Sequence, residues 1–423
     1  MKDSNFKKFM LLWLGELISQ IGGGLTSFGL GVYVFQLTGS AGKMAIVTLI
    51  GFLPTLLLSV PAGALADKYD RRILMMMGDG FSAIGIIYIL VNMILGRLTF
   101  IRICVGVLIS SVFSSLLEPA YRSTISDMLT EEDYSKASGL VSLAGNARYL
   151  VSPILAGLLL TFCDITVLFI IDISTFVLTV ITTFVVKKGI KTTVNNDKNQ
   201  SLLTSIKEGW TALSANKGVI SLVLVSAVLT LFIGVFQILA EPMVLSFSDA
   251  KTLGTTETIC ALGMVVSGLL LGIKGIKKGY VKVLSISLAM AGVFIALFGV
   301  WENVILMCVF GFAFFLMLPF ANGCLDYLVR TNVPDELQGR VWGFIGFLSQ
   351  IGYVVAYGLS GVLADGISKV NGISVGRGAS VVVIGAGIAL VVLAILPVCM
   401  KSIKALEKPE DAAEMTCEEV ASN

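Results

Sequence analysis

The sequence predicts an all-α integral membrane protein in which twelve transmembrane helices form two pseudo-symmetric six-helix bundles. Three observations predict this fold class. Of the 423 residues, 56% are hydrophobic and only 14% are charged, against about 25% charged in soluble domains. Apolar runs recur along almost the whole chain, each near the roughly 20 residues that a helix needs to cross a bilayer. Finally, loop residues around Glu131 recur around Asp335 at a constant offset of 204 residues.

The apolar runs give the order of the predicted spans. The first six lie at about 9–37, 43–66, 73–95, 98–120, 139–160 and 165–187, and the next six at about 217–245, 254–275, 281–299, 303–328, 340–365 and 377–400. We therefore expect an N-terminal bundle over 1–187, a cytoplasmic linker over 188–216, a C-terminal bundle over 217–400 and a cytoplasmic, disordered tail over 401–423.

The linker contains apolar residues at helical spacing. Leu203, Ile206, Trp210 and Leu213 recur every three or four residues, which predicts an amphipathic helix. Such a helix lies on the membrane surface or packs on the cytoplasmic ends of the spans, and the sequence leaves both open.

Basic residues set the predicted orientation, because Lys and Arg in short loops stay on the cytoplasmic side. With a cytoplasmic N-terminus, 23 Lys and Arg residues fall in cytoplasmic segments and 6 in external ones. Both termini are therefore expected in the cytoplasm.

The two predicted halves resemble each other. Glu131, Glu132 and Lys136 follow the fourth span, and Asp335, Glu336 and Arg340 follow the tenth at the same intervals. Two repeated six-helix halves around a midplane cavity are typical of secondary transporters.

Several classes of function are disfavoured by what the sequence lacks. The chain has no histidine, its seven cysteines show no paired spacing, and its net charge is +2. We expect no metal site, no cofactor, no enzymatic activity and no nucleic-acid partner. The sequence also has no Gly-rich phosphate loop, so ATP is not expected to drive the protein. We expect a monomer in the lipid bilayer.

A charged loop separates the second and third spans. Its distinctive residues are Gly63, Asp67, Lys68, Asp70, Arg71 and Arg72. This loop resembles the signature loop of the major facilitator superfamily, with Asp70 in place of the second glycine, as in its macrolide-efflux branch. The resemblance implies a conformational latch, whereas a simple positive-inside anchor is the alternative. The corresponding second-half loop, at 268–278, lacks the aspartate, so any latch should be asymmetric.

The resemblance to the macrolide-efflux and multidrug branch covers nearly the whole chain. It is carried by residues 13–16, 19–22, 37–40 and 339–341, and by Glu118, Pro119, Asn146, Arg148, Pro153, Gly157 and Asp172. We assign structural roles to Asp79, Pro153, Gly157 and Arg340. Two departures stand out. Glu16 occupies a position where the family commonly has Gln, and Arg148 and Ser152 replace glycines of the fifth-span motif of antiporters.

Ionisable residues inside spans are costly, about 2.5 to 3.5 kcal/mol each on insertion scales, and usually face a cavity or a partner. Candidates for proton coupling or substrate contact are Glu16, Glu118, Arg148, Asp172, Glu241 and Asp326. Arg148 needs a carboxylate partner, and Glu118 or Asp172 can supply it if their helices adjoin.

Each candidate has a structural alternative. Glu16 and Glu241 lie about two turns from a span end and can extend to water. Glu118 and Asp326 can simply mark cytoplasmic helix ends. Asp79 lies about two turns beyond Arg72 and is expected to be a partner of the loop.

Aromatic and Met side chains suggest an adaptable apolar pocket, although lipid contact and packing are the commoner roles of such residues. They are Phe28, Tyr33, Phe35, Phe113, Tyr149, Phe232, Phe236, Phe315, Met317, Trp342, Tyr353 and Tyr357. Glycines in the first and eleventh spans, Gly22 and Gly24 among them, should let helices approach closely.

The resemblance implies a bacterial inner-membrane secondary transporter that exports small hydrophobic or amphipathic compounds, such as macrolides or other drugs, with protons as the coupling ion. Metabolite uptake and siderophore export by the same fold are alternatives. A non-transporting membrane sensor or assembly subunit is a further alternative, against which the twelve-span symmetry argues.

Overall fold

The computed structural model describes residues 5–187, 217–333 and 335–407. The predicted amphipathic helix at 203–213 and most of the predicted tail, from residue 408, lie outside these residues. The described residues form helices and connecting turns, with no β-strand among them. Twelve segments are long and apolar enough to cross a membrane, which confirms the predicted twelve-helix, all-α fold of a multi-pass membrane protein.

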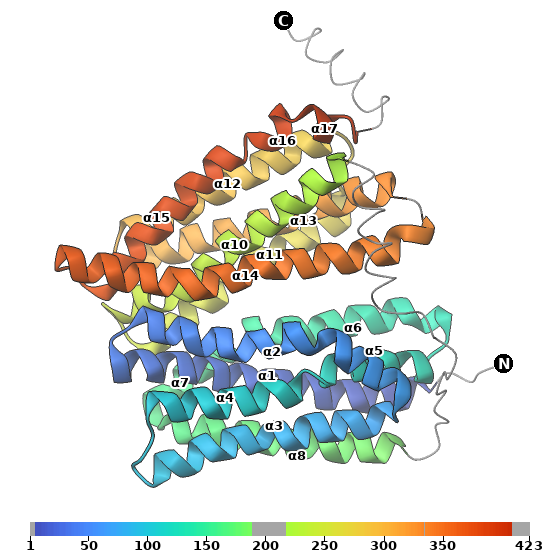
Figure 1. Ribbon diagram of the computed structural model, residues 1–423, viewed down its shortest axis with the longest axis vertical. Coiled ribbons are helices and arrows are strands. Elements are labelled where there is room, and N and C mark those ends of the chain that lie inside the picture. The colour runs from blue at the N-terminus through green and yellow to red at the C-terminus, as the bar shows by residue number, and fades with distance from the viewer. Residues whose placement is uncertain (1–4, 188–216, 334, 408–423) are drawn as a thin grey trace, which may run out of the picture. The chain divides into compact units, whose positions relative to one another are not determined.

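In the described part of the chain eight helices precede residue 188, and Figure 1 labels them. They are α1 (Phe6–Thr38), α2 (Ala41–Lys68), α3 (Arg71–Ile94), α4 (Phe100–Ser114), α5 (Leu117–Met128), α6 (Glu131–Leu150), α7 (Ser152–Phe162) and α8 (Ile165–Lys187). Together they make six spans, because α4 with α5 and α6 with α7 each form one.

Eight further helices follow residue 216. They are α10 (Lys217–Leu245), α11 (Ala250–Lys274), α12 (Tyr280–Val300), α13 (Val304–Asn332), α14 (Asp335–Asn371), α15 (Val375–Leu393), α16 (Leu396–Cys399) and α17 (Lys401–Lys404). The last two are single turns, and α15 with α16 forms the twelfth span.

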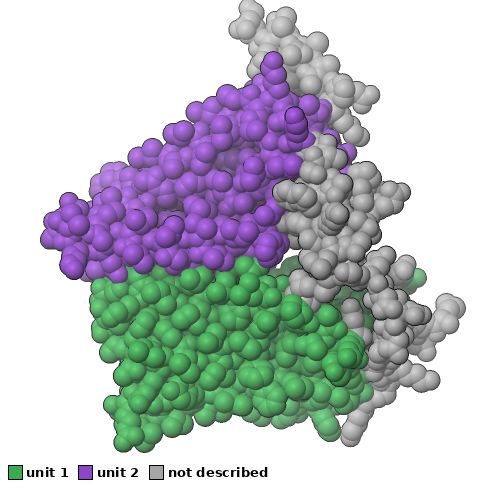
Figure 2. All heavy atoms as spheres, in the orientation of Figure 1, with its two compact units in different colours: residues 1–198, 248–258 green, residues 199–247, 259–423 purple. Residues whose placement is uncertain are grey.

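The chain divides into two compact units, coloured separately in Figure 2. Unit 1 comprises residues 1–198 and 248–258, and unit 2 comprises residues 199–247 and 259–423. The first turns of α11 thus belong to unit 1, although the sequence places this helix in the C-terminal bundle.

The fourth and fifth spans are interrupted, which hydropathy did not predict. Pro119 and Pro153 lie in the first turns of α5 and α7. A proline lacks the N–H that would bond the carbonyl four residues earlier. Each helix break lies between the proline and the residue that carries this carbonyl. The fourth span also continues to Met128, so Glu118 does not close it as expected. Their counterparts α13 and α14 are continuous, although α13 contains Pro319.

A hydrophobic cluster fills one end of unit 1. Phe9 and Leu12 of α1, Met75 of α3, Met128 of α5 and Val186 of α8 are all at most 2% exposed and belong to it. Burial of these side chains holds the helix ends together. Leu74, two residues after Arg72, also belongs to the cluster, so the charged loop before α3 lies next to it.

Candidate functional site

Two glycines of α1 bring charged residues of neighbouring helices close to one another. A Cβ atom at Gly22 would lie 2.5 Å from Thr175 Oγ1 and 3.1 Å from Asp172 Oδ1 of α8. At Gly24, a Cβ would collide with Ser152 of α7 and lie 3.1 Å from the Cγ atom of Arg148. Because α1 presents bare backbone at both positions, α6, α7 and α8 can all approach it closely.

Asp172 is the most deeply enclosed of the candidate carboxylates, with 1% exposure. Its carboxylate lies beside the hydroxyls of Thr26 and Thr175, which act on it as hydrogen-bond donors. Arg148 lies close enough for its positive charge to act on Asp172. Within the described part of the chain these two residues form no direct ion pair. The structure thus brings together Arg148 and Asp172, the pair that the sequence suggested.

Two further carboxylates lie near Asp172. Asp79 of α3 is 2% exposed, and its charged neighbours are Glu16 of α1 and Asp172, with the hydroxyl of Thr179 alongside. Glu16 accepts a hydrogen bond of 2.7 Å from Gln20 Nε2. We name Glu16, Asp79 and Asp172 the acidic cluster. The structure therefore places Asp79 among these carboxylates, whereas the sequence led us to expect it beside the charged loop.

Glu118 lies apart from this buried site. Its side chain is 74% exposed and pairs with Arg122 one turn along α5, at 2.9 Å. A pair so exposed contributes little free energy.

The charged loop between α2 and α3 is tied to two other helices of unit 1. Nη1 of Arg71 lies 2.7 Å from Oδ1 of Asp127 on α5 and donates to the carbonyl of Ser123. Asp70 accepts from the backbone N–H of Arg72, which caps α3, and lies 3.8 Å from Nζ of Lys187 at the end of α8.

The remaining residues of this loop differ in their surroundings. Arg72 is 1% exposed, Lys68 lies over the ring of Tyr69, and Gly63 borders open space. The side chain of Asp67 lies outside what the structure describes. The corresponding loop of unit 2 ends at Gly279, which has no side chain to cap α12, whereas Asp70 caps α3.

The fifth span packs on the first turns of α11 within unit 1. A Cβ at Gly157 would lie 2.6 Å from the carbonyl oxygen of Ala250, and one at Gly254 would collide with the carbonyl of Pro153. Thr258 donates to the carbonyl of Leu150 at 3.1 Å. Pro153 and Gly157 thus lie at a close helix contact. The side chain of Arg340 lies outside the described residues.

Sequence reasoning missed Asp127, the partner of Arg71, and Glu257, which lies partly buried on α11 one residue before Thr258. The signal for Glu257 was the one used for the other candidates, an ionisable residue inside an apolar run. Glu241 is partly buried near the end of α10, and Asp326 of α13 borders a cavity in unit 2.

Some of the aromatic residues expected to line a pocket pack against other rings, and others border a cavity. Phe236 and Phe315 belong to a cluster of rings with centroids 4.7 to 5.6 Å apart, a packing role. Tyr357 donates to Gln237 at 2.8 Å, and Trp342 borders the same cavity as Asp326.

Comparison with known proteins shows similarity to membrane transporters over most of the chain. Macrolide efflux protein A of Streptococcus pyogenes is 27% identical over 386 residues, which cover 86% of this chain and 92% of that protein. Multidrug efflux pump Tap of Mycolicibacterium fortuitum is 23% identical, covering 84% and 89%. Enterobactin exporter EntS of Salmonella typhimurium is 24% identical, covering 90% and 92%.

Solved structures show the same fold. The nucleoside transporter NupG superposes with a TM-score of 0.75 at 15% identity, covering 93% of this chain and 100% of that one. A bacterial homologue of the iron transporter ferroportin superposes with a TM-score of 0.70 at 16% identity, covering 93% and 100%. The family model of the Major Facilitator Superfamily matches residues 12–357, and the chain therefore belongs to the Major Facilitator Superfamily.

Proposed function

We propose that this chain is a proton-coupled exporter of hydrophobic or amphipathic compounds, acting by alternating access in the bacterial plasma membrane. Two of the similar proteins are named as a macrolide efflux protein and a multidrug efflux pump. We propose that the protein acts as a monomer. We also propose that both termini lie in the cytoplasm, in agreement with the distribution of Lys and Arg.

The observation that carries the proposal is the environment of Asp172. Its buried carboxylate lies beside the hydroxyls of Thr26 and Thr175, and a hydroxyl can donate to the ionised form and accept from the protonated form. The charge of Arg148 acts on the same carboxylate. In a low-dielectric interior this attraction is strong, and protonation abolishes it. A carboxylate that alternates between an arginine and a proton can therefore couple proton entry to a movement of helices.

The charged loop before α3 supports the conformational part of the proposal. Its contacts from Arg71 to Asp127 and from Asp70 to Lys187 join α3 to α5 and α8. Ion pairs at helix ends can hold one state of a two-state element and break in the other. Such a latch would act within unit 1, because the loop before α12 has a different cap.

The test measures substrate flux and proton movement together, in proteoliposomes with an imposed pH gradient. Erythromycin and tetraphenylphosphonium serve as substrates. We expect substrate-dependent proton movement with the wild type and its loss in Asp172→Asn. Asp164→Asn is the matched control, because Asp164 is exposed and lies just before α8. Wild-type flux that ignores the pH gradient, or an Asp172→Asn variant that still couples, would overturn the proposal.

Siderophore export is a second candidate, favoured by the similarity to the enterobactin exporter EntS. Cells that lack the protein distinguish the candidates. A drug exporter predicts increased drug sensitivity, whereas a siderophore exporter predicts siderophore retained inside the cell.

A further inference from the structure

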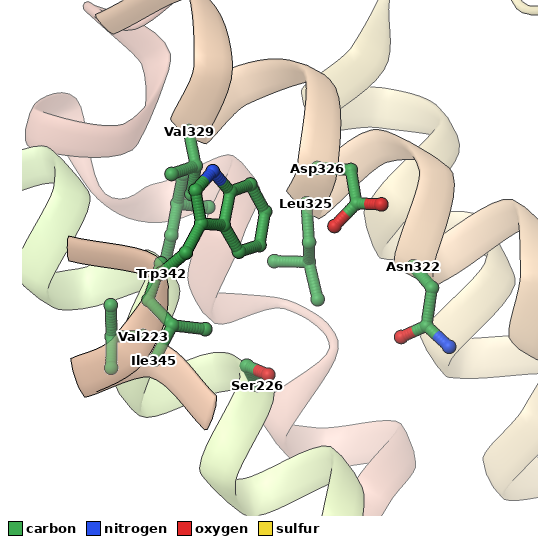
Figure 3. A pocket seen from close by; sticks show the side chains of 9 residues that line it. Val223, Ser226, Asn322, Leu325, Asp326, Val329, Trp342 and Ile345 are labelled. Atoms are coloured by element: carbon green, nitrogen blue, oxygen red, sulfur yellow. The ribbon is translucent and has the colours of Figure 1, made fainter. Parts of the chain in front are cut away.

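Helices α10, α13 and α14 enclose a cavity of about 290 Å³ within unit 2 (Figure 3). Leu325 and Ile345 contribute to its apolar wall, and Ser226, Asn322, Asp326 and Trp342 contribute polar atoms. Its lining is divided almost evenly between polar and apolar surface, and small-molecule sites combine an apolar wall with a few polar groups.

Among the side chains that the structure describes, Asp326 is the only acidic one that lines this cavity. Its side chain is exposed, and among the described residues it forms no ion pair. Arg330, one turn further along α13, lies with its Cζ atom 5.2 Å from the centroid of the Trp342 ring. The charge of Arg330 also acts on the exposed carboxylate of Asp326, so a ligand cation would share this carboxylate with Arg330. Figure 3 shows the carboxylate bordering the same space as the indole ring.

Trp342 adds an aromatic surface. Its Nε1 atom is buried and has no hydrogen-bond partner in the described structure. Because neighbouring protein atoms already shield this nitrogen, a ligand would pack on the ring and would not bond to the nitrogen. The hydroxyl of Ser226 is already bonded to that of Ser349 at 2.9 Å.

We propose that this cavity binds the protonated amine end of an amphipathic compound, with Asp326 pairing with the ammonium group and Trp342 packing on the adjoining apolar part. The carboxylate favours a cation and repels an anion. The amide of Asn322, one turn before Asp326, can accept from the same ammonium. The inference rests on the proposed function in one respect, because it takes the compounds bound here to be those exported.

The test is equilibrium binding to the purified full-length protein in nanodiscs, with no gradient present. The probe is a fluorescent dansyl sulfonamide carrying a dimethylaminopropyl chain, which is protonated at neutral pH. The reference probe carries a 4-methylpentyl chain, which has the same shape and no charge. Affinities are compared for wild type, Asp326→Asn and Trp342→Phe. Glu302→Gln is the control, because Glu302 is a carboxylate of unit 2 paired with Arg377 outside the cavity.

We expect Asp326→Asn to weaken binding of the amine about tenfold or more while leaving the uncharged probe unchanged, since only a charge-assisted hydrogen bond is lost. Trp342→Phe should weaken both probes. Equal binding of the two probes to wild type, or amine binding that Asp326→Asn leaves intact, would overturn the inference.

This measurement fails independently of the flux test. Amine binding through Asp326 without proton-coupled flux leaves the inference standing and removes the proposed function. Proton-coupled flux together with amine binding that does not depend on Asp326 leaves the proposed function standing and removes the inference.

Discussion

Arg71, the first residue of α3, forms a largely buried ion pair with Asp127 near the end of α5. The two atoms are 2.7 Å apart, and the side chains are only 14% and 4% exposed. Arg71 also donates to the carbonyls of Ala66 and Ser123. One guanidinium therefore joins the end of α2, the start of α3 and α5.

Replacing Arg71 with Leu should destabilise the protein by about 3 kcal/mol, because it removes the largely buried cation that pairs with the Asp127 carboxylate. Thermal unfolding in detergent, followed by tryptophan fluorescence, measures the effect. Arg122→Leu is the control, since its pair with Glu118 is exposed and should contribute about 1 kcal/mol or less. Equal losses from the two variants would show that burial of the Arg71 pair has no energetic consequence.

Gly22→Ala should reduce transport at least about tenfold, because its Cβ would lie 2.5 Å from Thr175 Oγ1 and 3.1 Å from Asp172 Oδ1. Tight helix contacts do not absorb an added methyl group without a shift of backbone or side chains. The adjacent Gly23→Ala is a matched control, since a Cβ there meets nothing within 4 Å. The measurement is substrate flux per reconstituted molecule. Activity retained in Gly22→Ala would mean that the packing of α1 on α8 does not constrain Asp172.

The number and order of the spans could be predicted from the sequence, because each membrane helix must present about twenty apolar residues. The interruptions at Pro119 and Pro153 could not. Pro319 also lies inside an apolar run, and α13 continues through it. Whether a proline interrupts a helix depends on the contacts that its neighbours offer to the freed carbonyl, and these contacts are tertiary.

The candidate site was predictable only in part, for a similar reason. That Arg148 needs a carboxylate follows from the cost of a charge inside a span, and Asp172 lies near it. The neighbours of Asp79 depend on how α1, α3 and α8 are rotated about their axes. The hydropathy pattern of a single sequence does not specify these rotations. Its distance along the chain from Arg72 therefore suggested a partner that the structure does not support.

Gly157→Ala should lower stability by about 1 to 3 kcal/mol, the usual cost of overpacking. Its Cβ would lie 2.6 Å from the carbonyl oxygen of Ala250, and backbone cannot move aside as a flexible side chain can. Gly145→Ala in the same span provides the comparison, because a Cβ there has no neighbour within 4 Å. Thermal unfolding of both variants checks the prediction, which fails if Gly157→Ala unfolds at the wild-type temperature.

Asp249 should make a pH-dependent contribution to stability, and it lies outside the spans, just before α11. Its Oδ1 accepts a hydrogen bond of 2.8 Å from the backbone N–H of Thr252, and bonding with Thr252 holds the pKa of Asp249 below its usual value of 3.8. A lowered pKa means that the ionised form stabilises the folded state above pH 3.8, and that this stabilisation is lost as the pH falls through the lowered pKa. Asp249→Ala should therefore unfold at a lower temperature than wild type at about pH 6, by the roughly 1 kcal/mol of a helix cap, and the difference should shrink towards about pH 3.

Asp249→Asn separates the charge from the cap, because its side-chain oxygen still accepts from Thr252 but does not titrate. We expect it to keep most of the stability at about pH 6, and its unfolding temperature relative to Asp249→Ala to stay constant as the pH falls. A gap between wild type and Asp249→Ala that is equally large at about pH 3 would show that the stabilisation comes from the side-chain hydrogen bond alone, with no contribution from ionisation.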